Sequence, residues 1–205
     1  MTTGIRKTIY IVILAAALAL GVTVALRTQV PDTPLFAFVL PEPNPVPAFS
    51  LLDQHGSPVD QSVFEGHWDL VFFGFTHCPD ICPTTLQVLA AARTQLVDIK
   101  ATPLPRIVLV SVDPERDTPE ILAQYVNYFG EGNLGLTGSI EELRKLTAGL
   151  GIYFEKQATT GDSYAVDHSA AVLLIDPDGG LHALFSGPHV VENYVHDLPL
   201  IMSKQ

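Results

Sequence analysis

The two cysteines of the chain, Cys78 and Cys82, are the residues with the most evident chemistry, and three residues separate them. On a helix this spacing places two Cα atoms roughly 6 Å apart on one face. Such a separation suits a disulfide, and it equally suits two thiolates that bind one soft metal ion. A single pair is too few for a disulfide scaffold. The pair therefore indicates a metal or redox site, with an inert structural disulfide as the alternative.

The segments on either side of the cysteines must position them. An apolar run over residues 69–75 is typical of a buried strand, and the residues from Pro83 onward have the periodicity of an amphipathic helix. Pro83 suits the first helical position, which places Cys82 at the helix cap and Cys78 in the preceding loop. The helix dipole then favours ionisation of both thiols. One helix face is expected to carry Leu86, Leu89, Ala90, Leu96 and Val97.

The remaining periodic segments predict an α/β domain of thioredoxin-like architecture, with a central mixed sheet flanked by helices. A fully apolar strand over residues 106–112 is of the kind that parallel sheets bury. Residues 170–176 and 181–186 form a predicted hairpin around a Pro-Asp-Gly-Gly turn. Other strands are expected at 49–53, 57–59 and 152–155, and helices at 119–129, 139–149 and 190–197, with Pro199 ending or kinking the last helix.

The distribution of charge excludes one class of partner. The chain has a formal net charge of −11, and from residue 28 onward it holds 8 basic and 22 acidic residues, a net charge of −14. Nucleic acids and anionic lipid surfaces would repel such a domain. Nucleic-acid binding is therefore not expected.

The N-terminal segment indicates a membrane anchor. Residues 9–26 are 18 positions without a charge, preceded by Arg6 and Lys7. This length just spans a bilayer as a helix, with a cleaved signal peptide as the alternative. The basic tail, residues 1–8, is expected in the cytoplasm, and the acidic domain across a bacterial inner membrane, in the periplasm. A proline-rich linker over residues 27–46 is expected to hold a domain of residues 47–205 away from the bilayer.

Three motifs together resemble the SCO/SenC family. They are Phe75-Thr-His-Cys-Pro-Asp-Ile-Cys-Pro83, Ser111-Val-Asp-Pro-Glu-Arg-Asp-Thr-Pro119 and Val166-Asp-His168. The spacing of the cysteines, Cys-x-x-x-Cys, differs from the Cys-x-x-Cys of thioredoxin-type disulfide exchangers. In their order the three motifs are specific, and the resemblance extends over most of the chain from about Val46 onward.

The resemblance implies a membrane-anchored copper protein that assists assembly of cytochrome c oxidase. Cys78, Cys82 and His168 would bind one copper ion, as Cu(I) or Cu(II), and pass it to the binuclear copper site of oxidase subunit II. A periplasmic copper donor would supply the ion. Two thiolates and an imidazole form a soft set of three ligands, which suits Cu(I). The alternatives are a thiol-disulfide reductase acting on the cysteines of that subunit, with Cys78 and Cys82 as its redox pair, and a copper-dependent redox sensor.

Other kinds of site are alternatives to a copper or redox site. A structural zinc site normally has four protein ligands, and a catalytic zinc site lacks an evident general base beside the cysteines. A peroxidase would need an arginine at its thiol, for which Arg116 and Arg144 are the candidates. Taken alone, His168 is an ordinary loop histidine. The charged loop at residues 113–117 predicts a helix cap and a docking surface. His77 is expected either to lie beside the ligands or to be exposed. The other histidines are expected at the surface: His55, His67, His182, His189 and His196.

Overall fold

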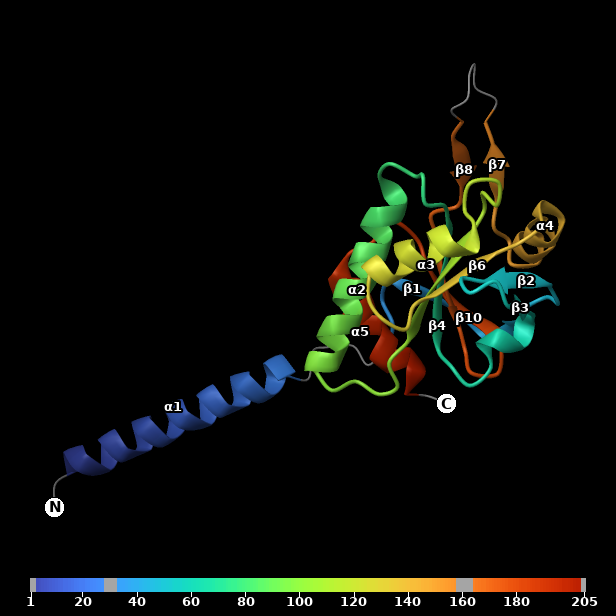
Figure 1. The fold of residues 1–205 in the computed structure, drawn as a ribbon. Helices are drawn as coiled ribbons and strands as arrows, with labels where there is room; N and C mark the ends of the chain where they lie inside the picture. The colour runs from blue at the N-terminus through green and yellow to red at the C-terminus, as the bar shows by residue number, and fades with distance from the viewer. Residues whose placement is uncertain (1–2, 28–32, 158–163, 204–205) are drawn as a thin grey trace. The chain divides into compact units, whose positions relative to one another are not determined.

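A computed structural model describes residues 3–27, 33–157 and 164–203 of the chain (Figure 1). The chain divides into two compact units, Met1–Thr33 and Pro34–Gln205. The first unit contains the helix α1 (Thr3–Arg27). In the described parts of the chain, no helix combines the length and the apolarity that crossing a bilayer requires. The membrane anchor predicted over residues 9–26 is thus not confirmed.

The centre of the second unit is the strand β4 (Asp69–Gly74), which is buried along its whole length. It pairs in parallel with β5 (Arg106–Ser111), which pairs in parallel with β6 (Leu134–Thr137). On its other side β4 pairs antiparallel with β9 (Val172–Ile175). A strand covered on both faces is continuously apolar, and this explains the unbroken run of hydrophobic residues in β4.

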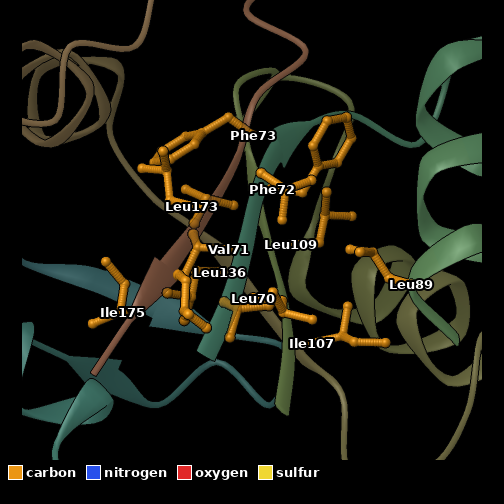
Figure 2. Close-up of a cluster of buried hydrophobic side chains, with 14 of the residues drawn as sticks. Leu70, Val71, Phe72, Phe73, Leu89, Ile107, Leu109, Leu136, Leu173 and Ile175 are labelled. Carbon is orange, nitrogen blue, oxygen red and sulfur yellow. The ribbon is translucent and has the colours of Figure 1, made fainter. Parts of the chain in front are cut away.

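Side chains alternate along β4 and build a core on each face of the sheet. Figure 2 shows Leu70 and Phe72 on the side of Leu89 and Ile107, whereas Val71 and Phe73 point to the side of Leu173. All of these residues are buried. Because side chains along a strand alternate in direction, the core fixes the register of β4 and hence the place at which the chain leaves it.

Within the described residues, the main sheet has eight strands, in the order β1-β10-β9-β4-β5-β6-β2-β3. Its outer strands are β10 (Gly180–Phe185), β2 (Leu51–Asp53), β3 (Pro58–Val59) and β1 (Ala37–Pro45). A separate two-stranded sheet consists of β7 (Phe154–Lys156) and β8 (Val166–His168), which pair antiparallel. Figure 1 shows these two strands projecting from the body of the domain.

The helices cover the sheet, and they confirm the predicted thioredoxin-like α/β fold. The helix α2 (Ile81–Asp98) packs against α5 (Val191–Met202), and α3 (Pro119–Tyr128) packs against β6. The helix α4 (Ile140–Gly149) begins at Ser139, whose hydroxyl accepts a hydrogen bond from the N–H of Glu142 as the sequence predicts. A short 3₁₀ helix, η1 (Gln61–Phe64), precedes β4.

The structure corrects the predicted linker. Residues 37–45, expected within an extended linker over residues 27–46, form the strand β1 and pair with β10. The prolines at 41, 43 and 45 are compatible with this strand because β1 is at the edge of the sheet, where one side needs no hydrogen-bond donors. Residues 28–32 of the linker lie outside the described residues. The carboxylate of Asp197 accepts three backbone N–H bonds, from Leu35, Phe36 and Ala37, and so fixes the entry into β1.

Two helix predictions were also wrong in detail. Pro199 does not end the last helix, which continues to Met202, because Leu198, Ile201 and Met202 are buried against the core. On α2, Val97 is about half exposed, and it does not share the buried face of Leu86, Leu89 and Leu96.

Candidate metal centre

The fold brings Cys78, Cys82 and His168 together although His168 lies 86 positions after Cys82 in the sequence. Their two Sγ atoms and one imidazole nitrogen all lie within 4.8 Å of one another. The Sγ atom of Cys82 is 3.4 Å from Nε2 of His168. Both cysteines are buried free thiols, and His168 is partly buried. The predicted proximity of the three residues is thus confirmed.

The start of α2 determines how the two thiols face each other. The helix begins at Ile81, so Cys82 lies in its first turn and not at the cap, where the sequence placed it. The cap residue, Asp80, makes no side-chain cap hydrogen bond. Instead, the Sγ atom of Cys78 accepts a hydrogen bond from the backbone N–H of Cys82 at 3.4 Å. The Cys78 thiol therefore satisfies an N–H that the helix itself leaves unpaired.

The buried carboxylate of Asp117 holds the loop that carries Cys78 by hydrogen bonds to Thr76. Asp117 accepts hydrogen bonds from the backbone N–H of Thr76 at 2.9 Å, from the Thr76 hydroxyl at 2.6 Å and from the Ser111 hydroxyl at 2.7 Å. The cap of α3 is Thr118, whose hydroxyl accepts from Ile121. The sequence interpretation of this loop as a helix cap and docking surface missed the role of Asp117, which is to hold the segment next to Cys78.

The same loop holds the strands that carry His168. The Tyr164 hydroxyl donates to Asp113 at 2.6 Å, and the Arg116 guanidinium lies 3.7 Å from the centre of the Tyr164 ring. Lys156 forms an ion pair with Glu115 at 2.6 Å. Residues 113–117 thus connect the cysteine loop on one side with β7 and β8 on the other. This common support explains why ligands so far apart in the sequence meet.

The His168 ring has a defined orientation and a defined tautomer. Phe72 and Phe75 approach it edge-on, with ring centres 5.7 and 5.9 Å away. Its Nδ1 is 3.1 Å from the backbone oxygen of Ser169, which only accepts hydrogen bonds, so Nδ1 carries the proton. The lone pair of Nε2 then points at Cys82. A neutral imidazole with a free Nε2 is the form that binds a metal ion.

Burial sets the protonation of the two groups in contact. It raises the pKa of the Cys82 thiol, and hydrogen bonding with Cys78 raises this pKa further. Burial also lowers the pKa of His168, against the opposing effects of the Ser169 carbonyl and Asp167. The expectation that the helix dipole makes Cys82 ionise easily was wrong, because desolvation of the thiolate outweighs the dipole. At neutral pH the site without metal therefore holds a protonated Cys82 and a neutral His168.

These protonation states predict how Cu(I) affinity depends on pH. Binding must release the Cys82 proton, so affinity rises with pH by at least about tenfold per unit between pH 6.5 and 8. His168 is already neutral there, because its pKa lies below the ordinary 6.5. It therefore adds no slope in this window. Competition titrations with a Cu(I) chelator at several pH values measure the slope, and a shallower slope in His168→Ala than in the wild type would contradict this assignment.

Gly74, at the end of β4, gives the site a second testable feature. A Cβ at this position would lie 2.9 Å from the Sγ of Cys82 and 2.9 Å from a carbon of the Phe72 ring. We expect Gly74→Ala to cost about 1–3 kcal/mol of stability and to weaken metal binding, because the sulfur and the ring must move. Urea denaturation and metal titration measure both effects. Gly21→Ala is the control, since its Cβ meets nothing within 4 Å, and equal behaviour of the two variants would refute the prediction.

Some polar groups near the site gave no sequence signal. The Thr85 and Tyr125 hydroxyl oxygens are buried and have no hydrogen-bond partner among the described residues. Burial raises the pKa of Tyr125, and negative charge on Cys82, Cys78 or Asp117 would raise it further. A lone threonine or tyrosine on a helix has no pattern that marks such a position.

Other predicted candidates lie outside the cluster. The His77 side chain is half exposed and lies 3.7 Å from Asp117. Arg116 pairs with Asp113, and Arg144 lies 3.6 Å from Glu155. Both arginines proposed for a peroxidase site are therefore engaged elsewhere. The cysteine–histidine cluster is the one group of three or more metal-ligating side chains found in the described residues, and it offers no fourth ligand for structural zinc. The donor set fits a soft ion with three ligands.

Comparisons with known proteins show which proteins this chain is similar to. The mouse (Mus musculus) mitochondrial SCO2 homologue is 43% identical over 132 residues, which cover 64% of this chain and 52% of that protein. This chain therefore spans about half the length of that relative. The crystal structure of Arabidopsis thaliana ScoI with copper bound matches with a TM-score of 0.73 and 33% identity, covering 78% of this chain and 98% of that one.

A more distant structure shares the fold. It is BsSco, described as a member of the Sco family of cytochrome c oxidase assembly proteins with a disulfide switch, and it matches with a TM-score of 0.60 and 21% identity over 82% of this chain and 99% of that one. The family model SCO1/SenC matches residues 40–203, a range that contains every element from β2 to α5 and all three clustered side chains. The chain belongs to the SCO1/SenC family.

Proposed function

We propose that this chain is a copper chaperone. It binds one copper ion through Cys78, Cys82 and His168 and delivers it to the binuclear copper centre of cytochrome c oxidase subunit II. The observation that carries the proposal is the meeting of two thiols and a free imidazole nitrogen within 4.8 Å. Copper in the Arabidopsis ScoI structure and the description of BsSco as an oxidase assembly protein support it.

The chemistry of the site suits a carrier. Cu(I) prefers soft ligands and low coordination numbers, and three protein ligands leave it accessible to an incoming ligand of the acceptor. Proton uptake also favours release of the ion. Burial raises the pKa of the Cys82 thiol, so Cys82 regains a proton once the copper ion has left. Protonation of the released thiol therefore opposes recapture of the ion.

A thiol-disulfide reductase is the second candidate function. Its support is the free thiol pair, in which the Cys78 Sγ accepts the Cys82 N–H. In that role two electrons pass from Cys78 and Cys82 to a disulfide of the subunit, and the pair becomes a disulfide. The Cys82 thiol is protonated at neutral pH, which disfavours it as the attacking nucleophile.

One experiment separates the two roles. The copper-loaded chain is mixed with a soluble fragment of subunit II, once with reduced and once with disulfide-bonded fragment, and both copper and free thiols on the fragment are counted. A chaperone transfers copper to the reduced fragment, and His168→Ala transfers less. Thiols that appear on the oxidised fragment without copper, at equal rates for wild type and His168→Ala, would favour the reductase. Copper that stays on the chain would favour a sensor.

We propose further that the domain works in the bacterial periplasm, supplied there by a copper donor and tethered to the inner membrane through the N-terminal segment. The support is the sequence, in which Arg6 and Lys7 precede 18 uncharged residues and the acidic domain follows. Protease treatment of spheroplasts tests this. Digestion of the domain in intact spheroplasts is expected, and protection of the domain until lysis would contradict it.

A further inference from the structure

The segment that follows His168 has little support from the sheets. Residues 169–171 lie between β8, in the small sheet, and β9, in the main sheet, and belong to neither strand. Ser169 makes two hydrogen bonds with the backbone of Tyr153. Its N–H donates to the Tyr153 carbonyl at 2.9 Å, and its hydroxyl accepts from the Tyr153 N–H at 3.0 Å. The orientation of His168 depends on this segment, because its Nδ1–H is bonded to the Ser169 carbonyl.

Two side-chain hydrogen bonds connect Tyr194 of α5 to Ala170, the next residue of this segment, through His189. The Tyr194 hydroxyl lies 2.7 Å from Nδ1 of His189, and Nε2 of His189 lies 2.6 Å from the backbone oxygen of Ala170. A carbonyl oxygen only accepts hydrogen bonds, so Nε2 carries the His189 proton and Nδ1 accepts from the Tyr194 hydroxyl. One tautomer of His189 therefore satisfies the Tyr194 hydroxyl, the His189 ring and the Ala170 carbonyl, with hydrogen bonds donated from Tyr194 to His189 and from His189 to Ala170.

The far end of this chain is firmly held. Tyr194 is fully buried, and its ring lies 4.4 Å from the ring of Phe185 in β10. The helix α5 that carries Tyr194 packs against α2, the helix that carries Cys82. His189 therefore connects residues 169–171, which follow the proposed ligand His168, to α5. Because α5 packs against α2, this connection also reaches the helix that carries Cys82. This connection was not predicted, because His189 was expected to be a surface histidine.

We infer that His189 and Tyr194 are positioning residues for His168, a role that rests on the proposed copper site. They fix the Ala170 carbonyl, and through residues 169–170 they hold Nε2 of His168 at its 3.4 Å distance from the Cys82 sulfur. Hydrogen bonds made directly to a metal ligand orient it, and their loss typically costs roughly 10–100-fold in metal affinity. Because His189 acts through the Ala170 carbonyl, one step further from the ligand, we expect the lower end of this range.

Three variants test the inference in the full chain. His189→Ala removes the whole connection, Tyr194→Phe removes only the outer hydrogen bond, and His189→Gln keeps a donor and an acceptor. Cu(I) affinity is measured by competition with bathocuproine disulfonate. We expect about a tenfold loss for His189→Ala, a smaller loss for Tyr194→Phe, and near wild-type affinity for His189→Gln. Unchanged affinity in His189→Ala would overturn the inference.

A double-mutant cycle separates positioning from general destabilisation. If His189 acts through His168, adding His189→Ala to His168→Ala causes no further loss of copper affinity. An equal further loss in that background would show that His189 supports the domain and not the ligand. His55→Ala, in an exposed turn, is the matched histidine control.

A metal-free readout keeps this inference separate from the copper proposal. Imidazole ¹⁵N chemical shifts of the reduced apoprotein report the tautomer and hydrogen bonding of His168. We expect them to change in His189→Ala and to remain near wild type in His189→Gln. A wild-type chain that retains no copper would refute the proposed function, whereas unchanged His168 shifts in His189→Ala would refute the positioning role whatever the copper result.

Discussion

Replacing Cys82 by serine is expected to lower Cu(I) affinity by more than ~100-fold, because even the loss of an outer hydrogen bond to a ligand costs roughly 10–100-fold. The Cys82 sulfur lies 3.4 Å from Nε2 of His168. A serine hydroxyl is a hard donor that does not ionise at neutral pH, so it does not replace a thiolate on a soft ion. Competition with a Cu(I) chelator measures the loss.

The fold should survive this substitution. Cys82 is fully buried, and a serine hydroxyl of similar size has Nε2 of His168 as a hydrogen-bond partner. Circular dichroism and the unfolding midpoint check that the variant is folded. Gln87→Ser is the matched control, because it introduces the same residue at an exposed position of α2. Copper affinity within tenfold of wild type in Cys82→Ser would exclude Cys82 as a ligand.

Asp117→Ala is expected to have the largest effect on stability, a loss of more than about 3 kcal/mol, because hydrogen bonds to a charged group are worth roughly 1.5–3 kcal/mol each. The variant leaves the Thr76 amide, the Thr76 hydroxyl and the Ser111 hydroxyl without their buried acceptor. Urea denaturation measures the change. Hydrogen exchange should also accelerate at the Thr76 amide, since the cysteine loop loses its support.

The control for this prediction is Asp98→Ala, which removes an exposed carboxylate from the last turn of α2. Its effect should stay within about 0.5 kcal/mol, as for surface substitutions in general. If Asp117→Ala costs no more than Asp98→Ala, the carboxylate does not hold the cysteine loop, and another contact must position Cys78.

The class of fold and the cysteine pair could be predicted because both leave regular patterns, whereas His168 was predicted as a ligand through the family resemblance. The apolar run of β4, the cysteine spacing and the position of His168 before a hairpin strand are all visible in the sequence. The supporting residues were not predictable in the same way. Asp117 and His189 act on backbone groups of segments 41 and 19 residues away, at Thr76 and Ala170. Such contacts depend on the packing of the whole domain and follow no local period.

Two further errors have the same origin. A thiol in the first turn of a helix is expected to ionise easily, yet the complete burial of Cys82 reverses the direction, and burial is a tertiary property. Prolines 41, 43 and 45 indicate a linker, yet they form part of β1 because that strand occupies a sheet edge. In each case the tertiary environment outweighs the local sequence signal.

We propose that two sulfur atoms and one imidazole nitrogen of a single chain bind the copper ion. X-ray absorption at the copper edge of the reduced, Cu(I)-loaded full chain tests it most directly. The structure predicts one copper per chain with a coordination shell of two sulfur atoms and one nitrogen, and loss of the nitrogen in His168→Ala. A shell of sulfur alone in the wild type, or a nitrogen that persists in His168→Ala, would contradict this ligand set.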